Sequence, residues 1–378
     1  MTSDSGRTSR RKFLATGAVA ATAWGIAGSG LGLAQKRPRG RYQERFRVDV
    51  HGHSLVPAYQ EALAAAGITA FHRIPIPAWT PELALEFMDQ HDIALQFLSV
   101  SDPGVSFMED DGEANRLARR VNEQVAAVVR ERPKRFGAFG VVNLRDVPSA
   151  VGQAKYCLDT LKMDGIGLLS SAEGRFVGDP VNAPLLDLLN ARRAWVMVHP
   201  TQPLDVDKPD YSMPDFVAEY PFDTTRAIIS LMFNGAFVKW PRIRWHFAHG
   251  GGCVPMVRGR LTTMAANAKP FGALLGLPAG SDVLVESSAR RQLRGLSYDT
   301  ALIADPPELK AVSSMAGPKQ MLFGSDWPFA ARTYDPAERD PAPALSDVFS
   351  RKHRHMVERL NARRKLPRAA RSVPGPGR

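Results

Sequence analysis

Hydrophobic positions along the chain fall into eight short runs, which longer stretches of mixed polar and apolar residues separate. The runs are Phe46–Val50, Ile93–Val100, Phe136–Val142, Gly165–Leu169, Ala194–Val198, Arg244–Ala248, Leu296–Tyr298 and Gln320–Phe323. Short apolar runs of this kind predict buried β-strands. In the intervening stretches apolar residues recur at helical spacing, which predicts helices over Pro81–His91, Ala114–Arg132, Pro148–Lys162, Ala183–Arg193, Thr224–Trp240 and Pro307–Met315.

Strands that alternate with helices predict right-handed βαβ units and a parallel sheet. Eight strands within residues 46–350 match a (β/α)₈ TIM barrel, which usually has about 250 residues plus insertions. A doubly wound sheet is the alternative, but no Gly-x-Gly-x-x-Gly follows the first strand, so no dinucleotide site is indicated. The longest irregular stretches, 51–80, 200–222 and 265–295, follow predicted strands, on the side where a barrel carries its active site.

The net charge of +11 is concentrated at the two ends of the chain. Residues 1–47 hold ten Lys/Arg against two Asp/Glu, and residues 351–378 hold ten against one, which leaves 29 basic and 35 acidic residues between them. This mildly acidic central region argues against a basic groove, so we expect no nucleic-acid partner. We expect residues 351–378 to be the end of a helix followed by a solvated basic tail.

The first 45 residues have the pattern of an export signal and a linker. Ser9-Arg10-Arg11-Lys12-Phe13-Leu14 precedes the weakly apolar run Ala15–Leu33, which ends in small residues. A basic start, an apolar middle and a small-residue cleavage site predict a signal peptide over 1–34, followed by a basic linker over 35–45. The arginine pair resembles a twin-arginine signal, which implies the twin-arginine export machinery as a partner and a periplasmic or secreted location. A membrane anchor is the alternative, which the Gly, Ala and Thr content disfavours.

Four of the predicted strands end in histidine or aspartate. His51 and His53 end the first strand, His199 and His249 follow the fifth and sixth, and Asp326 follows the eighth. In a parallel barrel these ends meet at the C-terminal rim. Side chains two apart on an extended segment point the same way, so two imidazoles can grip one ion. With a third histidine and a carboxylate, the pattern predicts a divalent metal site with positions open for a substrate; a surface pair is the alternative for the first two histidines alone.

The motifs resemble the aminocarboxymuconate-semialdehyde decarboxylase branch of the amidohydrolase superfamily, and within it bacterial proteins similar to 6-methylsalicylate decarboxylase. The resemblance covers about four-fifths of the chain. It runs through Val48–Pro57, Phe97–Ser101, Arg135–Phe139, His199–Thr201, Phe222–Arg226, His249–Gly252 with Arg260, Tyr298–Leu302, Leu322–Phe329 and, weakly, Asn361–Ala362.

The resemblance implies a distorted (β/α)₈ barrel, a homodimer and one divalent metal, most often Zn²⁺, with Mn²⁺ as an option. By position it implies His51, His53, His199 and Asp326 as metal ligands. His249 matches the catalytic acid/base, and Asp326 is counted with it as catalytic. A histidine titrating near ~6.5 suits proton exchange at neutral pH.

The chain departs from the branch at the residues that hold the substrate. The muconate-semialdehyde enzymes use two arginines; Arg260 matches the one that reaches across a dimer interface, but His72 stands at the other position, with Arg73 beside it. The γ-resorcylate decarboxylases carry Glu three residues after the catalytic histidine, where this chain has Gly252. Both substrates are therefore disfavoured, although Arg73 remains a candidate anion-binding group.

Further candidates are less specific. We count Arg175, in the loop after the fourth strand, and Trp327 among the substrate-binding candidates. Asp299 is expected either to face the substrate or support the site, or to cap the next helix. His246 is expected to face away from the site.

The leading hypothesis is a metal-dependent, non-oxidative decarboxylase (a carboxy-lyase) that acts on a small aromatic or unsaturated carboxylic acid. The main alternative is a hydrolase of a lactone, ester or amide that uses the same site. A third is an exported metal-binding protein without turnover.

Overall fold

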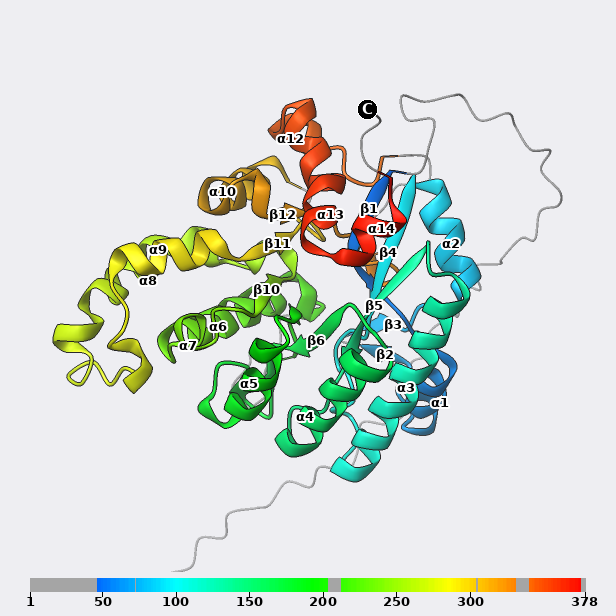
Figure 1. The fold of residues 1–378 in the computed structure, drawn as a ribbon, viewed down its shortest axis with the longest axis horizontal. Coiled ribbons are helices and arrows are strands. Elements are labelled where there is room, and N and C mark those ends of the chain that lie inside the picture. The colour runs from blue at the N-terminus through cyan, green and yellow to red at the C-terminus, as the bar shows by residue number, and fades with distance from the viewer. Residues whose placement is uncertain (1–45, 72, 203–211, 304, 331–339, 375–378) are drawn as a thin grey trace, which may run out of the picture. The chain divides into compact units, whose positions relative to one another are not determined.

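The computed structural model describes residues 46–71, 73–202, 212–303, 305–330 and 340–374. The predicted signal peptide over 1–34 and the linker over 35–45 lie outside these residues. Within them, one sheet of eight strands surrounds the centre of the fold (Figure 1). In spatial order the strands are β1 (Arg47–His53), β4 (Ile93–Ser99), β5 (Phe136–Val141), β6 (Gly165–Leu169), β9 (Trp195–His199), β10 (Arg244–Phe247), β11 (Ser297–Asp299) and β12 (Met321–Leu322).

The sheet closes into a barrel because the segment around β12 also pairs with β1. Gly52 forms a parallel bridge with Trp327, and the backbone N–H of Val50 donates to the carbonyl of Phe323 at 3.0 Å. The neighbouring strands in the sheet pair in parallel. The predicted (β/α)₈ barrel is confirmed, and each predicted strand overlaps a strand of the structure.

Helices connect the strands and cover the outside of the barrel. They are α1 (Pro57–Ala65), α2 (Pro81–Gln90), α3 (Asp111–Glu131), α4 (Val147–Lys155), α5 (Ala183–Ala191), α6 (Glu219–Phe233), α7 (Ala236–Lys239), α8 (Val254–Phe271), α9 (Glu286–Gly295), α10 (Pro306–Ala316), α11 (Leu345–Val348), α12 (Arg351–His355), α13 (Asn361–Lys365) and α14 (Pro367–Ser372). Several begin at a side-chain cap worth about 1 kcal/mol: Thr80 Oγ1 accepts from the N–H of Leu83 at 3.2 Å at the start of α2. Asp110 and Asp146 cap α3 and α4 in the same way.

Two stretches expected to be irregular contain regular structure. The stretch 265–295 holds the end of α8 and all of α9, which lie together at the left of Figure 1. Helix α9 buries only Ala289 and Leu293, which lie four residues apart on one face, so its apolar stripe is too short to indicate a helix. The stretch 51–80 holds α1 and a short hairpin of β2 (Ala70–Phe71) and β3 (Ile74–Pro75).

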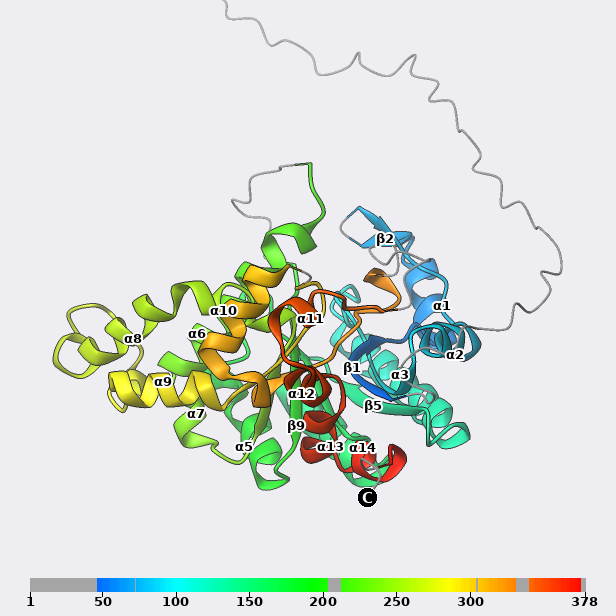
Figure 2. The same ribbon diagram turned by 90° about the horizontal axis from the view of Figure 1, so that it is seen from above.

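The expected solvated tail is wrong for residues 351–373. Helices α13 and α14 lie at the end of the barrel opposite the β2–β3 hairpin (Figure 2). They share one buried cluster with the strands, formed by Val48, Val50, Leu95, Phe97, Phe139, Trp195, Met197, Ala248, Leu322, Ala362, Leu366, Ala369 and Val373. The basic residues of this segment, which suggested a solvated tail, alternate with four apolar residues that are fully buried. The segment thus covers the end of the barrel at which the strands begin, opposite their C-terminal ends.

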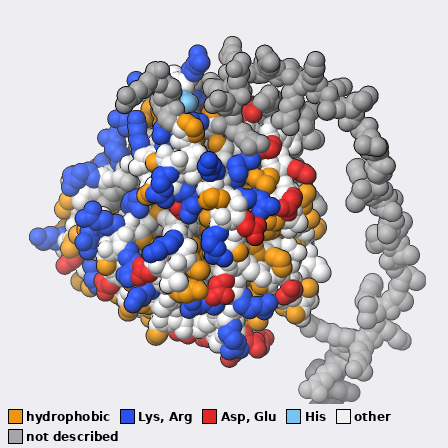
Figure 3. Space-filling view, turned by 45° about the vertical axis from the view of Figure 1, so that its right-hand side comes forward, with side chains coloured by type: hydrophobic (Ala, Val, Ile, Leu, Met, Phe, Trp, Pro, Cys, Tyr) orange, Lys and Arg blue, Asp and Glu red, His pale blue; other side chains and the backbone are white. Residues whose placement is uncertain are grey.

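Charged side chains do not form a continuous basic strip on the described part of the face in Figure 3, where Lys and Arg are scattered among acidic and hydrophobic side chains. Within the described residues, no helix is both long enough and apolar enough to cross a membrane.

Candidate metal centre

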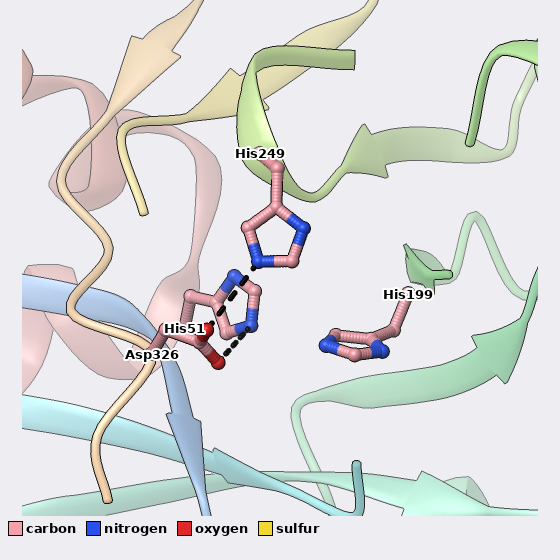
Figure 4. A group of neighbouring side chains, drawn as sticks. All are labelled: His51, His199, His249 and Asp326. Atoms are coloured by element: carbon pink, nitrogen blue, oxygen red, sulfur yellow. Dashed lines mark ion pairs between the residues drawn. The ribbon is translucent and has the colours of Figure 1, made fainter. Parts of the chain in front are cut away.

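The barrel brings together the five residues that the sequence places at strand ends. One ligand atom each of His51, His199, His249 and Asp326 lies within 4.8 Å of the others, and all four residues are buried. They come from different strand ends and point toward one another (Figure 4). The ring of His53 lies beside them, with its centroid 4.9 Å from that of His51 and 5.0 Å from that of His199. The structure therefore contains a buried cluster of His and Asp at the C-terminal ends of the strands.

Left-handed backbone turns aim two of these side chains into the barrel. His249 has a φ of 52° and Asp326 a φ of 57°. This conformation costs a residue other than Gly about 1–3 kcal/mol and is concentrated at functional sites. Three residues after His249, a Cβ on Gly252 would lie 2.1 Å from the carbonyl oxygen of Pro221, so only glycine lets the chain pass. Gly252 thus permits two backbone segments to approach closely beside the site.

Hydrogen bonds fix which nitrogen of three histidines carries the proton. His51 Nδ1 lies 2.9 Å from Asp299 Oδ2, and His199 Nδ1 lies 2.7 Å from the carbonyl oxygen of the following residue. His53 Nδ1 lies 3.1 Å from Ser99 Oγ, whose own hydroxyl donates to a backbone carbonyl of β1 at 3.1 Å. Each Nδ1 is therefore the donor, and each Nε2 keeps a lone pair directed into the cluster.

The lone pairs meet at distances that suit a shared cation. His51 Nε2 lies 3.1 Å from His53 Nε2, and Asp326 Oδ1 lies 2.8 Å from His53 Nε2 and 3.2 Å from His51 Nε2. Ligand atoms bonded at ~2.0–2.1 Å to one ion are about 3 Å apart. His249 Nε2 is buried, lies 3.5 Å from Asp326 Oδ2 and makes no hydrogen bond within the described residues. These residues thus fit a divalent metal ion, which would replace repulsion between acceptors with coordination.

The charges of the cluster are strongly coupled. Burial disfavours the protonated form of His51, but without a metal the carboxylates of Asp299 and Asp326 outweigh it and raise its pKa to about 10, so a cation that binds at Nε2 would have to displace the second proton of this ring. Burial raises the pKa of Asp326, yet His51 and the other histidines hold that pKa well below its usual range. Burial, reinforced by the neighbouring histidines, places the pKa of His199 well below 6.5. A neutral imidazole is the form that binds a metal.

Asp299 orients residues of the cluster through hydrogen bonds. Its carboxylate accepts from His51 Nδ1, from the backbone N–H of His249 at 2.9 Å and from that of Ala301 at 3.1 Å. His246 Nε2 donates to the same carboxylate at 3.1 Å. The expectation that His246 faces away from the neighbourhood of the site is therefore wrong: it faces the carboxylate that orients His51. The sequence feature that could have indicated this role is the position of His246, three residues before His249 on the same strand end.

Asp49 supports the other side of the turn. It accepts from the backbone N–H of His51 at 3.0 Å, from Ser325 N–H at 3.0 Å and from Gln96 Nε2 at 2.9 Å. Burial raises the pKa of Asp49 to about 6, although these donors oppose the shift. This residue ties the start of the His-x-His segment to the segment that carries Asp326, a role that the sequence analysis missed.

A pocket of about 530 Å³, including the part open to solvent, leads to the cluster. Its described lining is Phe71, Ile74, Ser101, Asp102, His199, Phe216, Tyr220, Leu302, Asp326, Phe329 and Ala330. Most of these side chains are apolar, and none of them is Lys or Arg. A small, flat, largely apolar molecule with one polar group directed at the cluster fits such a lining.

The predicted substrate-binding residues lie outside this lining. Arg73 is exposed on the β2–β3 turn, and Arg260 is exposed on α8. Arg175 is exposed on β8 (Arg175–Phe176), 3.7 Å from a carboxylate oxygen of Glu173. Trp327 is buried and stacks on a phenylalanine of α2 with ring centroids 5.4 Å apart. His72 lies outside the described residues. A substrate role for the four described residues stays a prediction.

Together, the closed parallel barrel and the His/Asp cluster at its C-terminal rim define a metal-dependent barrel of the kind that carries hydrolytic and lyase chemistry. The chain belongs to the amidohydrolase family, whose sequence profile matches residues 48–368.

Relatives of known activity include two decarboxylases. The 6-methylsalicylic acid decarboxylase of Penicillium expansum is 32% identical over 287 residues, which cover 75% of this chain and 85% of that enzyme. The 2-amino-3-carboxymuconate-6-semialdehyde decarboxylase of Dictyostelium discoideum is 28% identical over 260 residues, with 68% and 69% covered. The expected branch is thus confirmed, but the 6-methylsalicylic acid decarboxylases found are fungal, so the expected bacterial relationship is wrong.

Solved structures share the fold. A crystal structure of an amidohydrolase II has a TM-score of 0.75 at 25% identity, covering 84% of this chain and 99% of that one. The dihydroxybenzoic acid decarboxylase of Polaromonas sp. JS666, solved with manganese and the inhibitor 2-nitroresorcinol, has a TM-score of 0.67 at 19% identity, with 85% and 96% covered.

Proposed function

We propose that this protein is a metal-dependent, non-oxidative carboxy-lyase that releases CO₂ from a small aromatic carboxylic acid. The observation that carries this function is the buried His/Asp cluster at the floor of a small, mostly apolar pocket. The decarboxylase relatives support the reaction, and the apolar lining supports an aromatic substrate.

The ligands in this proposal are His51, His53, His199 and Asp326. His53 Nε2 lies 3.1 Å from His51 Nε2 and 2.8 Å from Asp326 Oδ1, and one ligand atom of His199 lies within 4.8 Å of those of His51 and Asp326. A divalent cation held there would supply a Lewis acid for the carboxylate of the substrate. In the reaction the bond between the ring carbon and CO₂ breaks, its electron pair stays on the ring carbon, and one proton replaces the lost group. In this proposal His249 delivers that proton from Nε2. Two contacts support this role: its backbone N–H donates to Asp299 at 2.9 Å, and its Nε2 lies 3.5 Å from Asp326 Oδ2.

The test is metal-dependent CO₂ release by the full mature chain from a panel of ortho-hydroxybenzoates and muconate-type acids. We expect His249→Asn to lower turnover by ~10²-fold or more, the scale of a lost general acid, while metal content stays unchanged. Asp326→Ala should lower the metal content itself. A metal-loaded protein that releases no CO₂ from any acid would contradict the proposal and favour the hydrolase, to be tested with lactones and esters.

We propose zinc as the metal. Three imidazole nitrogens and one carboxylate oxygen form a donor set in which nitrogen predominates, which suits Zn²⁺ better than Mn²⁺. Stripping the metal and restoring it with either ion tests this choice. Higher activity with Mn²⁺ at equal occupancy would reverse it.

A homodimer is also proposed, with its interface on α8 and the loop that follows. This surface exposes Met256, Phe271 and Leu274, and Arg260 lies among them. Exposed apolar side chains in such number are typical of association surfaces. Leu274→Glu should turn a dimer into a monomer in light scattering, and Arg260→Ala should raise KM if this arginine serves the partner's pocket. A wild-type monomer would contradict both.

Export by the twin-arginine route to the periplasm or the exterior is the remaining proposal, and Arg10 and Arg11 with Lys12-Phe13-Leu14 support it. Replacing both arginines with lysine should leave the protein in the cytoplasmic fraction. Unchanged export of that variant would contradict the route.

A further inference from the structure

One peptide unit beside the metal cluster is hydrogen-bonded on both of its sides. It joins Pro200 to Thr201, directly after His199 at the end of β9. Its carbonyl oxygen accepts from His199 Nδ1 at 2.7 Å, and its N–H donates to Asp223 Oδ2 at 3.0 Å. A trans peptide unit is planar, and its C=O and N–H point in opposite directions. The group that fixes the N–H therefore also fixes the direction of the carbonyl that meets His199.

Asp223 holds this N–H from a buried position on α6. The residue is fully buried, and the same carboxylate oxygen also accepts from the hydroxyl of Ser170. The Ser170 oxygen in turn accepts from the N–H of Thr201 at 3.1 Å. At the other end of the short segment, the backbone N–H of Ser170 donates to the carbonyl of His199 at 2.8 Å. Asp223 and Ser170 thus fix the segment from His199 to Thr201 at both ends.

The tautomer of His199 depends on this anchor. While the carbonyl of Pro200 faces Nδ1, the ring carries its proton on Nδ1 and keeps the Nε2 lone pair for a metal ion. If the peptide unit turned over, its N–H would face Nδ1, and the ring would accept there and carry its proton on Nε2. A proton on Nε2 blocks coordination. Asp223 is not among the described residues that line the pocket, so its effect on the site runs through the peptide unit.

We infer that Asp223 is a positioning residue for the metal site: through the peptide unit between Pro200 and Thr201, it sets the tautomer of His199 that can bind a metal ion. The inference rests on the ligand role proposed for His199, but it does not depend on the release of CO₂.

The experiment compares Asp223→Leu, Asp223→Asn and Asp164→Leu with wild type. Leucine fills the space and removes the acceptor, whereas the amide oxygen of asparagine can still accept from the N–H of Thr201. Asp164→Leu is the matched control. The side chain of Asp164 is 6% exposed and also accepts a backbone N–H, from Ala138 at 3.0 Å, but it precedes β6, at the opposite end of the strand that Ser170 follows.

Two quantities are measured. In the metal-free protein, nitrogen NMR of isotope-labelled histidine above pH 7 reports which ring nitrogen of His199 carries the proton, and His199→Gln assigns its signals. Competition between the protein and a chelator for Zn²⁺ reports the metal affinity. If Asp223→Leu does not fold, Asp223→Val takes its place, because the smaller side chain also lacks an acceptor.

We expect a proton on Nδ1 of His199 in wild type, Asp223→Asn and Asp164→Leu. Asp223→Leu should show a mixture of the two tautomers and a Zn²⁺ affinity lowered about 10–100-fold, whereas Asp223→Asn should keep most of the affinity. A proton on Nε2 in wild type overturns the inference without any variant. Wild-type tautomer and affinity in Asp223→Leu, or an equal loss in Asp164→Leu, overturns it too.

The inference and the proposed function can fail separately. If the affinity does not depend on Asp223 while wild type releases CO₂, the inference is wrong and the carboxy-lyase stands. If the tautomer and the affinity depend on Asp223 but metal-loaded wild type releases no CO₂ from any acid, the inference stands and the carboxy-lyase is wrong.

Discussion

The proton on His51 is determined by one carboxylate, Asp299. Because Asp299 accepts from His51 Nδ1 at 2.9 Å, the Nε2 lone pair faces the cluster. In Asp299→Asn the amide can donate to Nδ1 instead, which would move the proton to Nε2 and block coordination. We expect metal affinity to fall about 10–100-fold, as for other residues that orient metal ligands. Competition with a chelator measures the affinity.

His246→Gln and His246→Phe extend the same test. Glutamine keeps an N–H donor for Asp299 and should retain most of the affinity, whereas phenylalanine removes the donor and should lose it. Equal metal affinities in the two variants would show that His246 only fills space. Asp347→Asn, at an exposed site, is the control for the loss of a carboxylate charge in Asp299→Asn.

The titration of Asp223 makes stability depend on pH. Burial raises its pKa from 3.8 to about 6, although Ser170 and the N–H of Thr201 oppose the shift. Between these values the folded chain holds a proton that the unfolded chain has lost, so the free energy of unfolding falls as pH rises from about 4 to 6. The full effect is about 2–3 kcal/mol. We therefore expect the free energy of unfolding of Asp223→Asn, minus that of wild type, to be more positive at pH 7 than at pH 4 by this amount. Urea unfolding at the two pH values measures this difference, and a difference that does not depend on pH would contradict the assignment.

Single positions divide into those that the sequence reveals and those that need the fold. His51 and His199 follow apolar runs directly and Asp326 follows one after two small residues, so the alternation of strands and helices is enough to predict that they meet. Asp102 and Tyr220 are 118 residues apart and lie in no motif, and only the closed barrel brings them together. The resemblance indicates Arg260 and Arg73, and the loop after the fourth strand indicates Arg175, but neither signal carries information about the direction in which the side chain points.

At the scale of elements, the turn between β10 and α8 depends on a glycine. Gly252 has a φ of 61°, and a Cβ there would lie 2.1 Å from a backbone oxygen. Gly252→Ala should lower the free energy of unfolding by about 2–4 kcal/mol through backbone strain and overpacking. Gly259→Ala in α8 is the control, because a Cβ there meets nothing within 4 Å and alanine favours a helix by up to ~1 kcal/mol. Similar effects of both changes on chemical denaturation would contradict this account.

The strands were predictable and some helices were not, for a physical reason. A barrel strand is buried and reads as a continuous apolar run. Helix α9 fully buries only Ala289 and Leu293, and α1 buries Ala58, Tyr59 and Leu63 within an alanine-rich stretch. Tertiary contacts rather than an apolar stripe hold such helices, so their sequences resemble loops.

At the scale of the whole molecule, the C-terminal helical segment is bonded to the first strand of the barrel. Glu358, which is fully buried, accepts from Arg47 Nε at 3.0 Å and from Arg354 Nη2 at 3.0 Å. Arg359 donates to the carbonyl of Phe46 at 2.9 Å. The basic residues that suggested a solvated tail are partly internal ion-pair and hydrogen-bond donors, and composition alone cannot separate the two uses.

The contribution of this closure can be measured at Leu366, which is fully buried against the strands between α13 and α14. Leu366→Ala leaves a cavity in that cluster, so we expect the free energy of unfolding to fall by about 2–5 kcal/mol. Metal content at the opposite end of the barrel should be unchanged in the folded variant. Arg364→Ala, an exposed change in α13, should have little effect. If Leu366→Ala also has little effect in chemical denaturation, the packing of α13 and α14 against the strands contributes little to the stability of the barrel.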